Sequence, residues 1–488
     1  MKFFLRARLV GSIVLALAFF LASPVLAQRE YSYWTFGTGL GLAFDQVRGP
    51  VPAMNGSDAY EACTAVSDSA GNLLCYSNSV SVFDRNHELM PNGRAGLALN
   101  SSAAQGALLL RQPGSFRYYY LFTVGNAETG LVDGLRYTVI DMSLRGGLGD
   151  VVPSQKAVNV APVGKVGEAL TGIRHANGRD YWIVVRAWNT PDSRCYLFSP
   201  EGLAAQPVMS TLGLVHTGGL DNLYTSDETP AHFNSTGYLR ASPDGRWLAL
   251  TGGRLPVQLF EFNNRTGRVL RGQALSVPYS AAQPAGYGLE FSDDSSKLYA
   301  TVNGTFSIYP YVLYQFNLTS YSPPVPLLTT QEILGALAKG PDGRIYLTSL
   351  CSPRLSVITR PNETGSACGL EVQTVAFGGT PRQGQCGIGL PNCPNAIARE
   401  VDLSTTVATM PNIITPNGDG LNQALVLAEP NPDEWSIAIY NRWGKEVHRQ
   451  ERYDNSWAAP GQPDGVYFYL LTRRSTGQTY KGWVEVLR

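Results

Sequence analysis

The chain has 488 residues, and its 38 Lys and Arg balance its 38 Asp and Glu, so the formal net charge is zero. This balance argues against a nucleic-acid partner, because no basic excess is present to neutralise phosphates. Charged residues are only 16 % of the chain, whereas Gly, Pro and Tyr number 51, 31 and 25. The composition is typical of an extracellular, turn-rich β-protein, and the length predicts at least two domains.

Residues 1–27 have the pattern of a secretory signal peptide. Basic residues precede an apolar run, Leu9–Leu21, and Val25-Leu26-Ala27 places small residues ahead of a predicted cleavage before Gln28. The run is shorter than the about 20 residues that span a bilayer, and Pro24 follows it, so a membrane anchor is disfavoured. No Cys stands at the cleavage point, which disfavours a lipoprotein anchor.

Signal cleavage removes three basic and no acidic residues, which leaves 35 Lys and Arg against 38 Asp and Glu. No later segment is apolar for long enough to span a membrane. We therefore expect Sec-type export and a mature chain that is secreted or held on the exterior of the outer membrane.

Residues 28–400 contain short β-rich runs separated by Gly, Asn, Asp and Pro turns, with almost no helical periodicity. A turn followed by a strand recurs at Pro243-Asp244-Gly245, Asp293-Asp294-Ser295 and Pro341-Asp342-Gly343, with the middle aspartates 50 and 48 positions apart. Pro presets φ, Asp bonds nearby amides and Gly accepts a positive φ, so such motifs favour tight turns. A period of about 40–50 residues with several strands each is the signature of a β-propeller. We expect about seven blades, with Tyr33–Gly37 completing the last blade.

Six further strings stand out in the same region: Trp34-Thr35-Phe36-Gly37, Asp84-Arg85-Asn86-His87, Met90-Pro91-Asn92-Gly93, Gly134-Leu135-Arg136-Tyr137, Gly146-Gly147-Leu148-Gly149-Asp150 and His175-Ala176-Asn177-Gly178. The three turns resemble those of TolB, YVTN and WD40-like propeller repeats. The wider set is similar to the N-terminal propeller region of secreted Bacteroidota proteins that end in a gliding-motility-associated C-terminal domain. This resemblance implies an architecture and an export route, and no single chemistry.

Residues 401–410 are rich in Thr, Ser and Ala and are expected to link the propeller to a C-terminal domain, residues 411–488. The motif residues of that domain are Thr415, Pro416, Asn417, Gly418, Asp419, Gly420, Asn441, Arg442, Trp443, Gly444, Pro463, Asp464, Gly465, Lys481 and Gly482. Their order and spacing resemble the gliding-motility-associated C-terminal domain, which is the type B sorting domain of type IX secretion. The resemblance implies that the secretion machinery is a partner.

The strand pattern of this tail predicts a small Ig-like β-sandwich of about seven strands. Trp435, Ile437 and Ile439 alternate with Ser436, Ala438 and Tyr440, so one sheet face is strongly apolar. The expected fold of the whole chain is therefore all-β. Three tryptophans are expected to be core or turn anchors: Trp443, Trp457 and Trp483.

Seven cysteines in an oxidising compartment predict disulfide bonds. Structural zinc is disfavoured because no CxxC pair is present. Spacing does not fix connectivity, and the pairing that proximity favours is Cys63–Cys75, Cys351–Cys368 and Cys386–Cys393, with Cys195 as a free thiol.

No catalytic motif of the GxSxG, HExxH, P-loop or dinucleotide type is present. A turn-rich stretch between two blades holds donors suited to a metal or to acid–base work, but their spacing matches no motif, and a solvated loop is favoured. These donors are His216, Asp221, Asp227, Glu228 and His232.

Other polar positions also favour structural interpretations. His175 is interpreted as a turn residue, and Asp84, Arg85 and His87 as residues of a strand corner. Asn417, Asp419 and Asn422 have oxygens for a calcium loop, but the EF-hand spacing is missing and a backbone-bonded turn is favoured. No metal and no cofactor are expected.

The favoured function is that of an exported propeller that binds a polysaccharide, a protein or another surface ligand, without enzyme activity. One alternative is a secreted carbohydrate-active hydrolase or lyase that uses carboxylates in the propeller funnel, which sequence alone would not reveal. A second alternative is a structural component of the surface or gliding apparatus.

Overall fold

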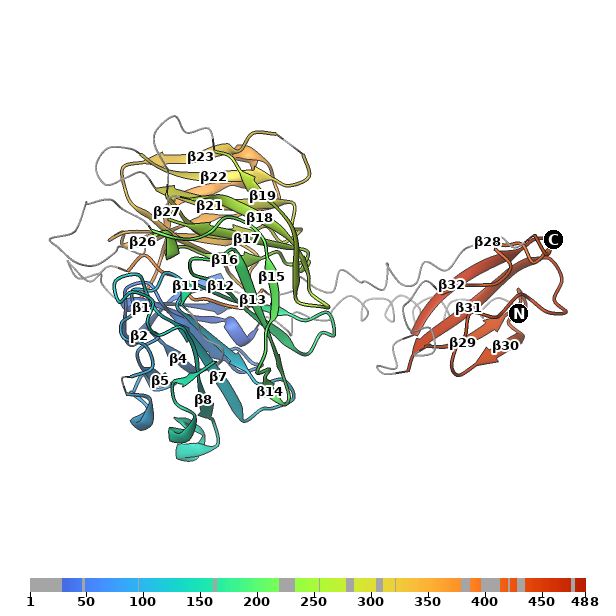
Figure 1. Ribbon diagram of the computed structural model, residues 1–488, viewed down its shortest axis with the longest axis horizontal. Helices are drawn as coiled ribbons and strands as arrows, with labels where there is room; N and C mark the ends of the chain where they lie inside the picture. The colour runs from blue at the N-terminus through green and yellow to red at the C-terminus, as the bar shows by residue number, and fades with distance from the viewer. Residues whose placement is uncertain are drawn as a thin grey trace, which may run out of the picture. The chain divides into compact units, whose positions relative to one another are not determined.

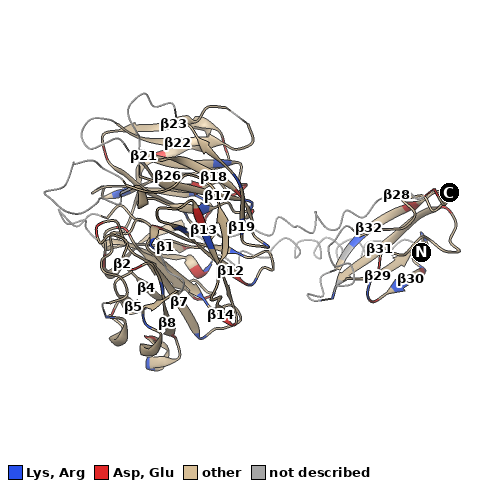
Figure 2. Ribbon diagram, viewed as in Figure 1, with Lys and Arg blue, Asp and Glu red and all other residues tan. Residues whose placement is uncertain are grey.

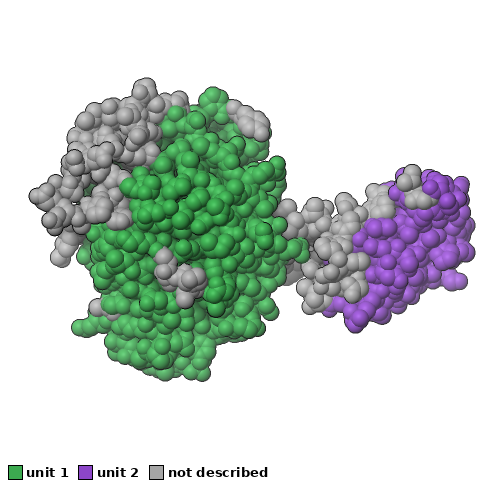
Figure 3. Space-filling view, in the orientation of Figure 1, with its two compact units in different colours: residues 1–398 green, residues 399–488 purple. Residues whose placement is uncertain are grey.

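The computed structural model describes residues 29–45, 49–94, 96–160, 165–218, 233–253, 255–277, 285–303, 310–320, 322–378, 387–395, 413–419, 422–427, 435–474 and 479–488. The chain divides into two compact units, residues 1–398 and 399–488 (Figure 3). In these ranges, unit 1 has strands and six short 3-10 helices, unit 2 has strands, and neither contains an α-helix. Charged residues are sparse along the ribbons of both units (Figure 2). The all-β prediction is confirmed.

Unit 1 is a β-propeller, and its described strands form seven antiparallel sheets (Figure 1). The first two sheets are β1 (Tyr33–Asp45) with β2 (Gly49–Ala59), and β3 (Thr64–Ser67), β4 (Leu73–Ser77) and β5 (Val82–Asp84). The third sheet has β6 (Ala107–Arg111), β7 (Tyr118–Val124), β8 (Leu135–Asp141), β9 (Asp150–Val151) and β10 (Val158–Asn159). The fourth has β11 (Val166–Arg174), β12 (Tyr181–Ala187), β13 (Asp192–Ser199), β14 (Gly202–Leu203) and β15 (Val208–Thr211).

The remaining three sheets have four strands each, paired in chain order. They are β16 (Leu239–Ala241), β17 (Trp247–Gly252), β18 (Leu255–Asn263) and β19 (Arg268–Leu275); β20 (Ala285–Phe291), β21 (Lys297–Asn303), β22 (Tyr311–Asn317) and β23 (Val325–Thr330); and β24 (Leu334–Lys339), β25 (Ile345–Ser349), β26 (Arg354–Ile358) and β27 (Leu370–Ala376). The short helices are η1 (Arg29–Tyr31), η2 (Pro91–Gly93), η3 (Leu144–Gly147), η4 (Pro153–Gln155), η5 (Phe233–Ser235) and η6 (Gly365–Cys368).

The recurring aspartate turns join the first and second strands of the last three sheets. Asp244 accepts the Arg246 N–H at 3.0 Å, Asp294 accepts the Ser296 N–H at 3.0 Å, and Asp342 accepts the Arg344 N–H at 3.2 Å. Gly245 and Gly343 have φ of 69° and 78°, which a residue with a Cβ rarely adopts. The three equivalent turns confirm that the spacing read from the sequence is the blade period.

The first strands of successive sheets form the inner wall of the ring, because β3, β6, β11, β16, β20 and β24 contact one another in that order. Hydrophobic clusters fill the spaces between neighbouring sheets. One of them joins Leu108 and Leu110 of β6 to Ile183 and Val185 of β12, all fully buried. Burial between sheets supplies the apolar core that a single small sheet lacks.

Strand β1 closes the ring differently from the expectation. It pairs with β2 in a separate hairpin and reaches the last blade through one bridge, Gly41 to Gly378, so it does not extend the ladder of that blade. Aromatic packing makes the rest of the contact: the Trp34 and Tyr346 ring centroids are 5.5 Å apart. The hairpin therefore stands as a seventh sheet between the last blade and β3, which it also contacts.

Unit 2 has one five-stranded sheet in its described part, in the order β28-β32-β31-β29-β30. Its strands are β28 (Ile413–Ile414), β29 (Trp435–Tyr440), β30 (Glu446–Gln450), β31 (Gly465–Arg473) and β32 (Thr479–Val486). Trp435, Ile437 and Ile439 lie on the buried face, as their alternation predicts. About seven strands were expected; in the described residues, non-strand segments around Leu425 and Trp457 cover that face instead of a second sheet.

Candidate functional site

A stretch of chain, residues 387–395, runs along the inner strands of the propeller; we call it the channel segment. Its Ile388 N–H donates to the carbonyl of Tyr60 ahead of β3 (2.9 Å), and the Ile388 carbonyl accepts from the Ala336 N–H in β24 (2.9 Å). The last residue of the segment donates its N–H to the Gly172 carbonyl in β11 (3.0 Å). The segment thereby bonds to inner strands of different blades and occupies the space that an open funnel would need.

Asn392 is the main polar anchor of the channel segment and is 2 % exposed. Its Nδ2 donates to the Ala107 carbonyl in β6 (3.0 Å) and to the Leu170 carbonyl in β11 (2.8 Å). Its Oδ1 accepts from Gln105 Nε2 (3.1 Å) and from Arg240 Nη1 (3.2 Å). One side chain therefore bonds four buried polar groups from three separate stretches of chain, and its own amide is fully bonded, as a buried amide must be.

Two buried carboxylates, Glu61 and Glu168, lie at the mouth of the channel where the inner strands begin. Glu61 Oε1 accepts the hydroxyl proton of Tyr287 in β20 (2.7 Å), and its Oε2 accepts from Ser102 Oγ (3.2 Å). Glu168, in β11, accepts backbone N–H groups from the loop before β6 and from the loop between β7 and β8, at 2.9 and 2.6 Å. These bonds join blades that are distant in sequence.

Burial raises the pKa of both carboxyl groups. The pKa of Glu61 lies well above its usual value because of desolvation and, second, the nearby charge of Glu168. Desolvation raises the pKa of Glu168 to about 8, against the opposing effect of the two amide bonds. A carboxyl that holds its proton near neutral pH has the character of a general acid. However, Glu61 and Glu168 are only 6 % and 1 % exposed, and their oxygens are engaged internally.

The opposite mouth, where the inner strands end, has a small pocket of about 80 Å³. The channel segment contributes Cys393 and Pro394 to its lining. In this pocket, Arg240 pairs with Glu290 (Nε to Oε2, 3.7 Å), and Lys339 pairs with Asp293 (Nζ to Oδ1, 2.8 Å). Both cations are therefore already paired with carboxylates.

His216 is the one sequence candidate of its group that falls within the described ranges. Its Nδ1 lies 3.0 Å from the Asn234 carbonyl and its Nε2 lies 3.1 Å from Gln258 Nε2, which fits a neutral ring with the proton on Nδ1. Burial lowers the pKa of His216 to about 4. The ring is therefore a structural hydrogen-bonding group. The other four candidates, Asp221, Asp227, Glu228 and His232, lie outside the described residues.

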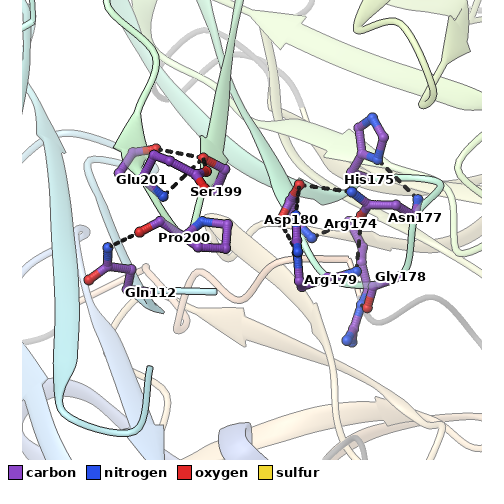
Figure 4. A network of polar contacts seen from close by, with 11 residues as sticks. Gln112, Arg174, His175, Asn177, Gly178, Arg179, Asp180, Ser199, Pro200 and Glu201 are labelled. Atoms are coloured by element: carbon purple, nitrogen blue, oxygen red, sulfur yellow. Dashed lines mark hydrogen bonds and ion pairs between the residues drawn. The ribbon is translucent and has the colours of Figure 1, made fainter. Parts of the chain in front are cut away.

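His175 occupies a hydrogen-bonded turn, as the sequence indicates (Figure 4). Its Nδ1 accepts the Asn177 N–H (3.0 Å), and its Nε2 lies 3.0 Å from the Arg265 carbonyl. Asp180 completes the turn by pairing with Arg179 (2.8 Å). These polar groups bond within the β11–β12 connection and to the β18–β19 connection of the next blade, so both ring nitrogens of His175 are engaged in structural contacts.

Asp84 and Arg85 lie at a corner between the second and third sheets. Asp84 is fully buried and pairs with Arg145 at 3.0 Å, while Arg85 Nη2 donates to the Gly147 carbonyl at 2.8 Å. Asn92 Nδ2 donates to Asp150 Oδ2 at 2.9 Å in the same corner. Three strings that carry the propeller resemblance thus come together here, and their role is to join two blades. His87 lies beside them, with Nδ1 3.2 Å from the Tyr76 hydroxyl.

The hairpin disulfide expected between Cys63 and Cys75 does not form. In the β3–β4 register, Cys75 is opposite Val66, and Cys63 lies three residues before Val66. Cys63 packs toward the channel, whereas Cys75 packs between two blades. Cys368 is buried without a disulfide bond, so the pair with Cys351 does not form either. Cys195, expected to be free, is a buried thiol without a disulfide bond. Cys386 lies outside the described residues, and its proposed partner Cys393 has no disulfide bond among the described residues.

In unit 2, the motif stretch after β28 forms a self-bonded turn. Asn417 Nδ2 donates to Asp419 Oδ2 (3.1 Å), Asp419 N–H donates to Asn417 Oδ1 (3.1 Å), and Gln423 Nε2 donates to Asp419 Oδ1 (2.9 Å). Gly418 has φ of 87°, and Thr415 closes the loop by donating its N–H to the residue 422 carbonyl (2.8 Å). The side-chain oxygens of Asn417 and Asp419, two of the three residues considered for calcium, are thus bonded within the turn. Gly420 lies outside the described residues, and Pro416 precedes the turn.

Two motif stretches that are 40 positions apart, Asn441–Gly444 and Lys481–Gly482, line one groove of about 390 Å³ on the sheet. Asn441 Oδ1 holds the β29–β30 turn by accepting the N–H groups of Trp443 and Lys445 (3.1 and 3.0 Å). Arg442 stacks on the Trp443 ring, 4.3 Å from its centroid. In the described part of unit 2, this groove brings separate sorting-motif residues together around open space.

The expected tryptophan anchors behave differently from one another. Trp457 is a core residue at 2 % exposure, but Trp443 is 74 % exposed on its turn and Trp483 is 44 % exposed on the sheet. The third motif stretch, Pro463-Asp464-Gly465, ties down the chain end, since Asp464 pairs with Arg488 at 2.9 Å.

Fold and sites together define an all-β protein with a channel-filled propeller and a small C-terminal sheet domain whose motif residues surround a groove. Residues 408–486 match the family described as the CHU_C type IX secretion signal domain. The chain therefore carries a type IX sorting domain behind a β-propeller, and this domain directs export to the cell surface or the medium. Within the described residues no helix is long and apolar enough to cross a membrane.

Solved structures similar to this chain are propeller proteins of low sequence identity. They include a protein from Lactobacillus plantarum (12 % identity, 74 % of this chain and 98 % of that chain, TM-score 0.42). The periplasmic gluconolactonase of Pseudomonas aeruginosa is 15 % identical over 73 % of this chain and 98 % of its own, with TM-score 0.41. PorZ of Porphyromonas gingivalis, a surface component of the type IX secretion system, is 11 % identical over 95 % of this chain and 60 % of its own, with TM-score 0.33. No curated protein sequence matches the chain.

Proposed function

We propose that this protein is an exported binding protein whose propeller holds an extracellular ligand at the mouth where the inner strands begin. Three exposed apolar side chains there carry the proposal: Tyr60, Leu99 and Val132, at 46 %, 59 % and 61 % exposure. Their backbones lie close together. The Leu99 N–H donates to Asp133 Oδ2 (3.1 Å), one position from Val132, and the Tyr60 N–H donates to Ser101 Oγ (3.4 Å), two positions from Leu99. Clustered exposed apolar groups are typical of binding surfaces.

The closed channel supports binding over catalysis. A hydrolase of the propeller type needs two carboxylates open to substrate, whereas the channel segment fills the funnel and Glu61 and Glu168 are bonded internally. An aromatic ring beside two aliphatic side chains suits the apolar face of a sugar or a protein surface.

A carbohydrate-active hydrolase is the second candidate, favoured by the raised pKa values of Glu61 and Glu168. Its carboxylates would become available only if the loops around them opened. The hydrolase hypothesis predicts substrate turnover that is lost when either carboxylate is substituted, whereas the binding hypothesis predicts no turnover.

The test exposes the mature full-length chain to an array of polysaccharides and surface proteins and assays each bound glycan for cleavage products. We expect binding without cleavage, weakened about tenfold or more by Tyr60→Ser and Leu99→Ser. Met209→Ser is the control, because Met209 is equally exposed at 46 % but lies on β15 at the outside of its blade. Cleavage that Glu61→Gln and Glu168→Gln abolish would establish the hydrolase instead.

A further inference from the structure

The outer face of the unit 2 sheet carries a row of aromatic side chains. Tyr440 of β29 is opposite Phe468 of β31, and Phe468 is opposite Trp483 of β32. Phe468 and Trp483 are 50 % and 44 % exposed. Side chains directly opposite on neighbouring strands are about 5 Å apart, so the three rings form one continuous row.

Alternation along the strands shows that this row is separate from the core. In β31, Tyr467 and Tyr469 on either side of Phe468 are buried at 3 % and 8 %. Ile413 of β28 and Val466 of β31 extend the outer face and are 45 % and 39 % exposed. A small sheet with one packed face normally presents a polar face to water. Here the second face carries exposed apolar side chains, with Glu485 between Ile413 and Val466, and such a group of side chains indicates a surface that a partner covers.

The polar surroundings of the row show what kind of partner fits. The groove formed by Asn441–Gly444 and Lys481–Gly482 adjoins Phe468 and Leu470 and places Arg442 and Lys481 at its edge. An apolar centre with charged groups at the rim is the usual arrangement of a protein–protein interface. Cations at this edge would complement carboxylates on the partner.

We propose that this aromatic face, Tyr440, Phe468 and Trp483 with Ile413 and Val466, is the surface by which a protein component of the type IX secretion machinery docks on the sorting domain. The proposal rests on the export route given by the match of residues 408–486 to a secretion signal domain. A signal that is read as a folded domain must be read from an exposed surface. Here the exposed apolar face and two separate motif stretches coincide.

The test compares full-length variants produced in a bacterium with type IX secretion, with surface, medium and periplasmic protein each measured. Phe468→Ser and Trp483→Ser are expected to reduce the exported amount about tenfold or more, with the chain retained in the periplasm. The matched control is Val426→Ser. Val426 is 46 % exposed between the buried Leu425 and Leu427, which pack on the inner face, so Val426 points away from the sheet. The control is expected to be exported like the wild type.

Lys481→Glu keeps the test decisive if a serine variant fails to fold, because Lys481 is exposed at the groove and lies outside the core. It is expected to reduce export about tenfold while the retained protein stays protease-resistant. Normal export of folded Phe468→Ser, Trp483→Ser and Lys481→Glu overturns the docking proposal. So does a wild-type dimer that the same variants dissociate while export continues, since the face would then bind a second copy.

A deletion of residues 413–488 separates this proposal from the proposed function. If the deletion stops export while the face variants are exported, only the docking surface is wrong. If the truncated chain is exported normally, the sorting route itself is wrong, and the docking proposal falls with it.

Discussion

Single buried polar residues connect parts of this propeller that are far apart in the chain. Gln105 donates to the Leu239 carbonyl (3.0 Å) and accepts from the Leu239 N–H (2.8 Å), so a side chain just ahead of β6 bonds to β16, which is not the next inner strand in the ring. Glu61 and Tyr287 make a similar connection across 226 positions. Such bonds add little net energy when complete, but a missing partner leaves a buried group unsatisfied, at a cost of about 1–3 kcal/mol. They therefore specify how blades join.

Glu168 should make the stability of the propeller depend on pH. Its pKa is about 8 in the folded chain against an ordinary 4.5, so its stabilising contribution is full below pH 4.5 and is lost as pH rises through 8. We expect the free energy of unfolding to fall across this window by up to about 1.4 kcal/mol per pH unit. Urea unfolding of Glu168→Gln should show a flatter dependence. The exposed β27 carboxylate Glu371 gives the control Glu371→Gln, and an unchanged slope in Glu168→Gln would contradict the assignment.

At the scale of elements, the channel segment stabilises the closed ring of blades from inside. The β1–β2 hairpin closes the circle of sheets from the side, and the segment bonds to inner strands from within. Its close approach depends on Gly387 and Gly389. A Cβ on Gly387 would lie 2.6 Å from the Ala59 carbonyl oxygen, and one on Gly389 would lie 1.8 Å from the Glu61 carbonyl oxygen. Ala59 ends β2 and Glu61 lies just ahead of β3, so neither backbone atom is able to move without disturbing one of these two strands.

Gly389→Ala should consequently displace the segment and lower the free energy of unfolding by about 3 kcal/mol or more. Gly167→Ala in β11 is the matched control, because the nearest atom to its Cβ is at an ordinary 3.4 Å and its φ is not positive. Denaturant titration of both variants measures the difference. Equal stability of the two would show that the segment is dispensable for the ring.

At the scale of the whole molecule, the two units have separate hydrophobic cores. Among the described residues, the core of unit 2 contains residues from 414 to 486 alone, and none of the other core clusters includes a residue of that unit. Domains with independent cores unfold as independent cooperative units. The sorting domain can thus keep its fold whatever the propeller binds.

Calorimetry of the mature chain should resolve two transitions. Leu471→Ala, at a fully buried position of the unit 2 core, should lower one transition and leave the other unchanged. Leu347→Ala, equally buried in a propeller cluster, should do the reverse. A single transition that both substitutions shift would show that the units unfold together.

Local chemistry in the sequence was sufficient for the fold class, the blade period and the export route. The turns at Asp244, Asp294 and Asp342 depend on residues within a few positions, and the sorting motif lies in one continuous tail. The predicted all-β propeller with a C-terminal sheet domain is therefore confirmed, because tight turns and strand alternation are properties of short stretches.

Tertiary structure decided everything that depends on contacts between distant residues. The separate β1–β2 hairpin, the absent Cys63–Cys75 bond and the exposed strand position of Trp483 all depart from the expectations, because proximity along a chain does not show which side of a strand is covered. Glu61, Glu168 and Asn392 were missed for the same reason: their partners lie 41 or more positions away. Gly387 and Gly389 were the one local feature of the sequence that indicated the close backbone approach of the channel segment. Side-chain burial and partner choice are set by the packing of whole blades, which no short stretch of sequence contains.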